Sequence, residues 1–143
     1  MSSGPSSNSA PRANYSKEEL SDIYALAKMW LETGQIKRAE VAVKGLTTVA
    51  PEFMPGWLAR CVVESSLGNV ESALQAARRA LKLQPESATA MMLIVTASLT
   101  IGDISTAGTY LGEVGELVEQ GKIAEPNLIR LFKMQMARYT QGR

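Results

Sequence analysis

Residues 34–39 read Gly-Gln-Ile-Lys-Arg-Ala, and the same pattern returns at 68–73 (Gly-Asn-Val-Glu-Ser-Ala) and at 102–107 (Gly-Asp-Ile-Ser-Thr-Ala). The glycines are spaced by 34 residues, and so are the alanines. A fixed period of about 20–50 residues indicates stacked supersecondary units. Glycine tolerates the left-handed backbone conformation that ends a helix, and an alanine in the next helix lets the two helices touch. The pattern therefore predicts three helical hairpins, each turning at its glycine.

Start and stop signals divide the rest of the chain into helices. Ser16 and Glu19 form a capping-box pattern, so a first helix is expected from there to Gly34. Pro51 and Pro85 end helices because proline has no N–H to donate. The other helices are expected over about 36–49, 54–67, 69–83, 87–101, 103–120 and 125–140, with Asn69, Ser87 and Asp103 at helix starts. No strand is expected, so the chain is predicted to be all-α.

The composition excludes several classes of function. The 143 residues suit one domain, and a net charge of +1 gives no field that would attract nucleic acid or an anionic membrane. The chain has no histidine, the usual general base and metal ligand. No phosphate loop, paired carboxylates or metal-ligand cluster is recognisable. We therefore expect no catalytic, cofactor-binding or metal-binding residue, and no enzyme activity.

Three features bear on targeting and location. Residues 1–14 contain five serines and a single charged residue, which predicts a flexible tail before a single domain at 15–141. The tail lacks the apolar core of a signal peptide. Residues 87–101 carry no charge, but they are too few for a membrane span, which needs about 20 apolar residues. The lone Cys61 cannot form an internal disulfide, which fits a reducing compartment.

The three units, about 20–53, 54–87 and 88–121, resemble the tetratricopeptide repeat (TPR) family. The resemblance rests on apolar, Gly, Ala and Pro residues at the family's consensus positions: Ile23, Leu26, Ala27, Trp30, Gly34, Ala39 and Pro51, then Trp57, Gly68, Ala73, Ala80 and Pro85, then Met91, Ile94, Gly102, Ala107 and Leu111. The second unit departs from the pattern at Arg60, Cys61 and Glu64, and Glu119 replaces the third closing proline. The resemblance implies a short right-handed superhelix of three hairpins with a C-terminal capping helix at about 125–140.

In this family the first helix of each hairpin lines a concave groove that binds other proteins. The groove-facing positions map onto Tyr24, Lys28 and Leu31, then Leu58, Val62 and Ser65, then Met92, Thr96 and Leu99. The uncharged run at 87–101 adds to an apolar surface of the kind that usually marks a binding site. Two alternatives stay open: the groove binds a foreign segment, or it is filled by the protein's own tail, its last helix or a second copy.

Other notable residues have structural explanations. Cys61 is expected to be a buried structural thiol, Trp30 and Trp57 are expected in the core, and the basic run of Arg78, Arg79 and Lys82 is expected on a solvated face. Gly108, Gly112 and Gly115 leave one face of a helix nearly bare. That face is expected to dock the C-terminal helix, with a contact to another protein as the alternative.

The outline of three repeats, a short leader and one terminal helix resembles the small TPR chaperones of bacterial type III secretion systems. Residues 19–27 are similar to the opening of the translocator chaperones, and 102–107 resembles their third-repeat turn. The resemblance implies a cytoplasmic protein that holds a translocator or needle subunit before export. The sequence leaves a homo- or heterodimer open. The alternatives are a TPR scaffold in a permanent complex and a regulatory TPR domain that binds a folded enzyme. The groove lacks the lysine–asparagine set of heat-shock co-chaperones, because Lys28 stands alone.

Overall fold

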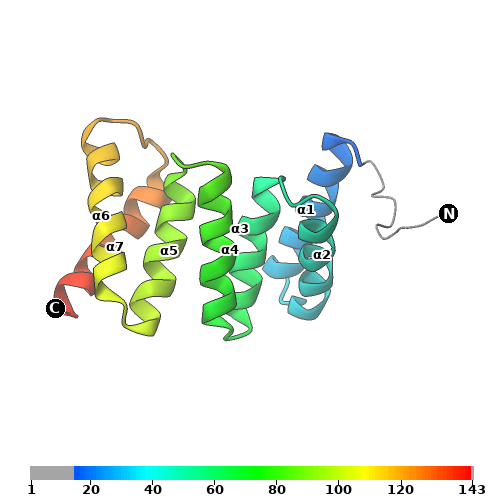
Figure 1. The fold of residues 1–143 in the computed structure, drawn as a ribbon, viewed down its shortest axis with the longest axis horizontal. Helices are drawn as coiled ribbons and strands as arrows, with labels where there is room; N and C mark the ends of the chain where they lie inside the picture. Colours follow the sequence, from blue (N-terminus) through cyan, green and yellow to red (C-terminus); the bar gives the residue numbers. More distant parts are fainter. Residues whose placement is uncertain (1–14, 143) are drawn as a thin grey trace.

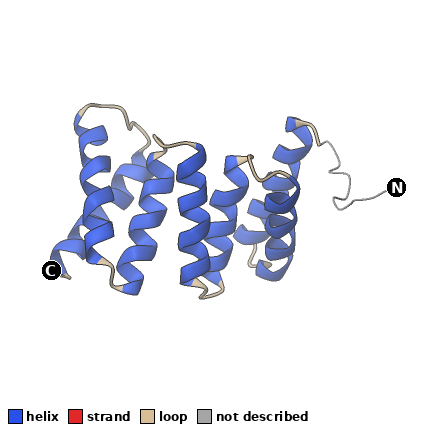
Figure 2. Ribbon diagram, in the orientation of Figure 1, coloured by secondary structure: helices blue, strands red, loops and turns tan. Residues whose placement is uncertain are grey.

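The computed structural model describes residues 15–142, and within them it contains helices and loops but no strand (Figure 2). The predicted leader at 1–14 lies outside this range. The helices are α1 (Lys17–Glu32), α2 (Ile36–Val49), α3 (Met54–Ser66), α4 (Val70–Leu83), α5 (Ala88–Ile101), α6 (Ile104–Glu119) and α7 (Pro126–Gln141). The all-α prediction is confirmed, and each predicted helix is present to within about two residues at its ends.

The helices form three hairpins that follow one another along the long axis of the molecule (Figure 1). Each hairpin packs its second helix against the first helix of the next one, so α2 contacts α3 and α4 contacts α5. The first helices also touch in a row, from α1 to α3 to α5. The C-terminal helix α7 contacts both α5 and α6. It therefore takes the place that the first helix of a fourth hairpin would occupy.

The turns inside the hairpins have the predicted chemistry. Gly34, Gly68 and Gly102 adopt φ values of 81°, 82° and 85°, which L side chains rarely tolerate. The alanines that follow them, Ala39, Ala73 and Ala107, are fully buried where the two helices of a hairpin meet. The repeated glycine and alanine thus fix where each hairpin turns and how closely its helices pack.

The helix starts agree with the predictions at most positions. Ser16 and Glu19 form the capping box, with the Glu19 N–H donating to Ser16 Oγ over 3.1 Å and the Ser16 N–H donating to Glu19 Oε1 over 2.8 Å. Asp103 accepts from the Thr106 N–H in the same way at the start of α6. Asn69 precedes α4 as predicted, but its side chain does not cap that helix. It donates instead to a buried carboxylate on α3, which is described below.

The core is a continuous layer of small and aliphatic side chains between neighbouring helices. Helix α5 lies deepest, with eight buried residues from Ala90 to Leu99. Four other helices contact α5: α3, α4, α6 and α7. A helix that is surrounded in this way has no face committed to water, and it is apolar all round. The absence of charge from 87–101 is thus explained by burial.

Candidate partner-binding surface

The six predicted groove residues of the first two hairpins lie on the adjacent helices α1 and α3, which contact each other. Lys28, Val62 and Ser65 are exposed, and Tyr24, Leu31 and Leu58 are partly exposed. Val62 keeps 40% of its surface accessible although it is a large apolar side chain. These six residues are called the α1–α3 surface below. It offers apolar side chains with a cation and a hydroxyl beside them.

Tyr24 is the fixed point of this surface. Its ring packs edge-on against Phe53, with centroids 6.4 Å apart and an interplanar angle of 77°, a favoured aromatic geometry. The Lys28 Nζ lies 5.6 Å from the Tyr24 ring centroid, within range of a cation–π interaction. Phe53 therefore restrains the Tyr24 ring from one side, and the surface presents a positioned aromatic group beside a positive charge.

The third hairpin is different, because α7 covers its predicted groove residues. Met92 is 0% exposed and Leu99 is also buried, and both belong to a cluster that includes apolar residues of α7. Thr96 Oγ1 accepts a hydrogen bond of 3.1 Å from Gln135 Nε2 of α7. Of the predicted groove residues, those of the α1–α3 surface therefore stay accessible in this structure, and the protein's own last helix covers those of the third hairpin. This corresponds to one of the alternatives that the sequence left open.

The glycines of α6 explain how α7 lies so close. Gly108 faces the Tyr139 ring and Gly115 faces Phe132, so two aromatic side chains occupy the space that missing Cβ atoms leave. Gly112 has nothing within 4 Å of its Cβ position and is exposed. The structure thus places two of the three predicted contact glycines against α7, and Gly112 beside solvent.

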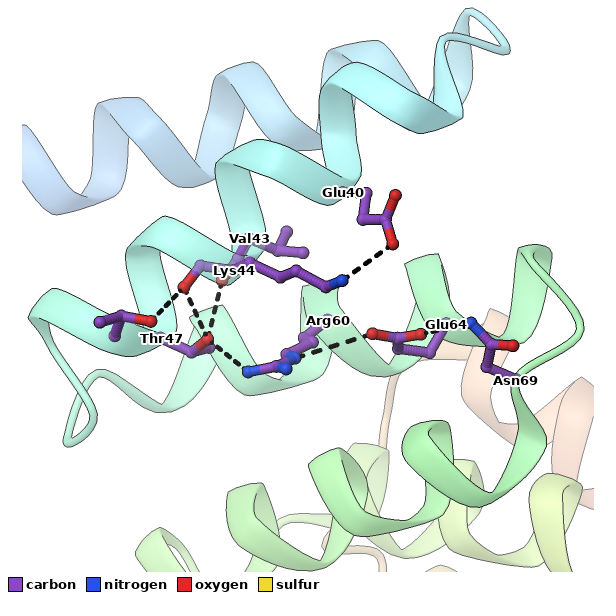
Figure 3. Close-up of polar contacts among 8 residues, drawn as sticks. Glu40, Val43, Lys44, Thr47, Arg60, Glu64 and Asn69 are labelled. Atoms are coloured by element: carbon purple, nitrogen blue, oxygen red, sulfur yellow. Dashed lines mark hydrogen bonds and ion pairs between the residues drawn. The ribbon is translucent and has the colours of Figure 1, made fainter.

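A polar seam between the first and second hairpins was not expected from the sequence (Figure 3). The Arg60 guanidinium of α3 donates to Thr47 Oγ1 of α2 over 2.9 Å and lies 3.9 Å from the Glu64 carboxylate. Glu64 is only 4% exposed, and its other oxygen accepts from Asn69 Nδ2 over 2.9 Å. Buried charges need such partners. The signal in the sequence was the departure from the TPR pattern at Arg60 and Glu64.

Cys61 is a buried thiol, as predicted. It is 1% exposed inside the cluster formed by α3, α4 and α5. Burial disfavours the thiolate and raises the pKa of Cys61 to about 11. A hydrogen bond with the Ser65 side chain lowers this pKa by a smaller amount. The thiolate is the reactive form, so this cysteine is protected from oxidation and nucleophilic chemistry.

The first hairpin leaves an apolar hollow at its outer side. The hollow encloses about 640 Å³ and is lined by Leu26, Trp30, Lys37, Arg38, Val41 and Ala42. Val41 is 73% exposed, and Leu26 is also exposed although it occupies a core position of the repeat pattern. Within residues 15–142 no helix packs on this side of the first hairpin, since α1 and α2 contact only each other and α3. The sequence did not predict this surface.

No helix between residues 15 and 142 combines the length and the apolar character that crossing a membrane requires. No family model matches the chain, and no curated protein matches it. Solved structures do match it.

The type III secretion chaperone SycD from Yersinia enterocolitica, in complex with a peptide of the translocator YopD, superimposes with a TM-score of 0.76 at 15% identity, over 89% of this chain and 94% of SycD. PcrH from Pseudomonas aeruginosa superimposes with a TM-score of 0.76 at 20% identity, over 93% of this chain and 98% of PcrH. PcrH has also been solved with the chaperone-binding regions of PopD and PopB. The TPR2B domain of yeast Sti1, in its complex with pHsp70, superimposes with a TM-score of 0.72 at 16% identity, over 87% of this chain and 98% of that domain's chain. The chain thus has a TPR-type fold, which it shares with the type III secretion chaperone SycD.

Proposed function

We propose that this protein is a TPR chaperone that holds a segment of another protein on the α1–α3 surface, and that its client is a translocator or needle subunit of a type III secretion system. One observation carries the proposal: apolar side chains remain accessible on the first helices of the first two hairpins, next to a positioned Tyr24. The likeness to SycD, which was solved with a peptide of the translocator YopD, and to PcrH, which was solved with the chaperone-binding region of PopD, supports it.

The mechanism we propose is coverage of an aggregation-prone segment. The client would bury apolar side chains against Leu31, Leu58 and Val62, and an interface of about 1,200–2,000 Å² in total would suit specific binding. Ordering a flexible client costs free energy, which keeps the complex reversible enough for release. The protein would act in the cytoplasm, as a binding protein without catalytic activity.

Helix α7 shortens the site that a client can use. Since Met92 and Leu99 are buried under α7, the client would contact two hairpins and would not need to displace the third. The client segment would therefore be short and would run across α1 and α3. Glutamate at Met92 would disrupt the core, so it cannot serve as a test of client binding.

The proposal can be tested by crosslinking in the native cell. A photoreactive p-benzoylphenylalanine replaces the exposed Val62 on α3, and a second variant carries it at the exposed Thr109 on α6 as a control. We expect irradiation to produce one dominant adduct with a secretion substrate from position 62 and no such adduct from position 109. The same adducts from both positions, or none from position 62, would refute the proposal.

A second candidate role follows from the apolar hollow on the first hairpin: pairing of two copies in a stable assembly. Glu18 and Asp22 lie on the Leu26 stripe of α1, and Arg38 lies on the Val41 stripe of α2. Since α1 and α2 form an antiparallel hairpin, the acidic and basic groups sit at opposite ends of this face. A two-fold axis through the apolar centre would place acid against base, as an isologous interface requires. SycD has been solved as a dimer, which supports this role.

Val41→Glu tests the pairing without disturbing the core, since Val41 is among the most exposed apolar side chains. We expect the wild-type chain to elute as a dimer in size-exclusion chromatography with light scattering, and Val41→Glu as a folded monomer. A wild-type monomer at about 100 µM, or a Val41→Glu dimer, would exclude this interface.

A further inference from the structure

A second hollow lies between the first and second hairpins. It is open to solvent, has a volume of about 560 Å³ and is lined by residues of α2, α3, α4 and the loop between α2 and α3. Two arginines and no carboxylate are among the lining residues, which include Thr47, Trp57, Arg60, Ser72, Gln75 and Arg79. None of these residues belongs to the α1–α3 surface.

The indole of Trp57 organises the hollow. Trp57 Nε1 donates to the Pro51 carbonyl over 2.8 Å, which fixes the ring. The guanidinium carbons of Arg60 and Arg79 lie 5.5 Å and 5.6 Å from the ring centroid. Both arginines are therefore within range of cation–π interactions with one indole. A guanidinium that stacks on a ring uses its face and leaves its N–H groups, which lie in its plane, free to donate to an oxyanion.

The two arginines have different electrostatic environments. Arg60 already has polar partners within the protein, because it donates to Thr47 and lies near the Glu64 carboxylate. Arg79 is exposed, and no carboxylate between residues 15 and 142 lies within 4.0 Å of it. Its neighbour Arg78 has the same charge but does not line the hollow. The basic run on α4, expected to be a solvated face, is thus split into one arginine that stacks over a cavity and one that points elsewhere.

We propose that this hollow binds an acidic segment of a partner protein, with a carboxylate accepting from Arg79 and Arg60 beside the Trp57 ring. Charge complementarity identifies the chemistry, since bidentate pairing of guanidinium and carboxylate is favourable in geometry and energy. The size of the hollow favours a peptide segment, because a single inorganic anion would occupy a small part of 560 Å³. The site is independent of the client surface, so either proposal can fail while the other stands.

The test uses the full chain labelled with ¹⁵N. Its two tryptophans give two indole N–H signals, and Trp30→Phe identifies the signal of Trp57. Hexaglutamate is titrated as the probe, and inorganic phosphate is titrated separately. We expect hexaglutamate to shift the Trp57 signal with saturation in the wild type and in Arg78→Gln. Arg79→Gln should weaken the binding by at least about tenfold, the effect of losing a hydrogen bond between charged groups.

Arg78→Gln and Arg79→Gln are matched controls, because they remove the same charge from adjacent exposed residues of one helix. An equal loss in both variants would show non-specific attraction and would overturn the proposal. Saturation by phosphate at the affinity of hexaglutamate would overturn the assignment to a peptide segment. If millimolar hexaglutamate does not shift the Trp57 signal, the proposal is also overturned. Circular dichroism establishes that each variant is folded.

Discussion

The phenolic oxygen of Tyr139 on α7 lies 2.7 Å from the position that a Cβ atom would take on Gly108 of α6. One heptad away, the ring of Phe132 lies 3.4 Å from the Cβ position of Gly115. Two rings spaced by seven residues on α7 thus rest on two glycines spaced by seven residues on α6. This register docks α7 over α5, so it determines which part of the predicted groove stays accessible.

Alanine at Gly108 should therefore behave differently from alanine at Gly112. Both glycines lie inside α6, where alanine is favoured by about 1 kcal/mol in helix propensity. Gly112→Ala meets open space, so we expect the free energy of unfolding to rise by about 0.5–1 kcal/mol. Gly108→Ala forces Tyr139 to move at a cost of about 1–3 kcal/mol, which cancels or exceeds the gain. Urea denaturation measures both values.

A double variant checks the physical reason for that difference. Tyr139→Leu shortens the side chain over Gly108, so the penalty of Gly108→Ala should disappear in the Tyr139→Leu background. If Gly108→Ala stabilises the wild-type chain as much as Gly112→Ala does, Tyr139 does not restrict this position and the described register of α7 is incorrect.

The seam at Arg60 and Glu64 should be sensitive to the loss of one partner and tolerant of the loss of both. Arg60→Leu, which restores the residue type of the TPR pattern, leaves the buried Glu64 carboxylate with Asn69 alone. Removing one member of a buried ion pair lowers the free energy of unfolding by about 3–5 kcal/mol. Because Arg60 is partly exposed, we expect a smaller decrease of about 2–3 kcal/mol. Replacing both residues by leucine should recover most of this loss. A single variant as stable as the double variant would contradict the account.

Cys61 should make the stability fall at alkaline pH. The folded-state pKa of Cys61 is about 11 and the ordinary thiol pKa is 9.0, so the folded state keeps its proton in a range where the unfolded chain loses it. The sign follows from linkage: stability is unaffected below about pH 9 and decreases as the pH rises toward 11. The full shift corresponds to about 2–3 kcal/mol. Cys61→Ala should lack this part of the pH dependence in urea titrations at pH 8 and pH 10.5, whatever its stability at pH 8. The same slope in both proteins would show that Cys61 is not the group concerned.

Local signals in the sequence were sufficient for the architecture. Gly34, Ala39 and Ser16 act within one turn or one hairpin, so their roles can be predicted from neighbours along the chain. The cover over Met92 depends on a helix that lies about 40 residues further along the chain, and no pattern within 87–101 distinguishes such cover from an open groove. The uncharged run at 87–101 was compatible with cover by a later helix and with an open groove.

Two other features depend on contacts between distant residues. Arg60 and Glu64 broke the repeat pattern, which marked them as unusual, but Thr47, to which Arg60 donates, comes from the preceding hairpin. The exposure of Val41 arises because no helix of residues 15–142 packs on that side of the first hairpin. The exposure of a consensus core residue such as Leu26 at the end of a repeat array can be predicted only when the neighbouring element is known.

If the α1–α3 surface holds the client, a charge placed on that surface should weaken client binding. The most direct test uses a synthetic peptide of the client segment identified by crosslinking and measures its Kd for two valine variants of the protein. Val62→Glu and Val41→Glu introduce the same charge at exposed valines on different faces. Isothermal titration calorimetry should give a Kd for Val62→Glu at least about tenfold weaker than that of the wild type, because a charge is buried against apolar groups. Val41→Glu should bind the peptide as the wild type does. Unchanged affinity in a folded Val62→Glu, or an equal loss in both variants, would contradict the account.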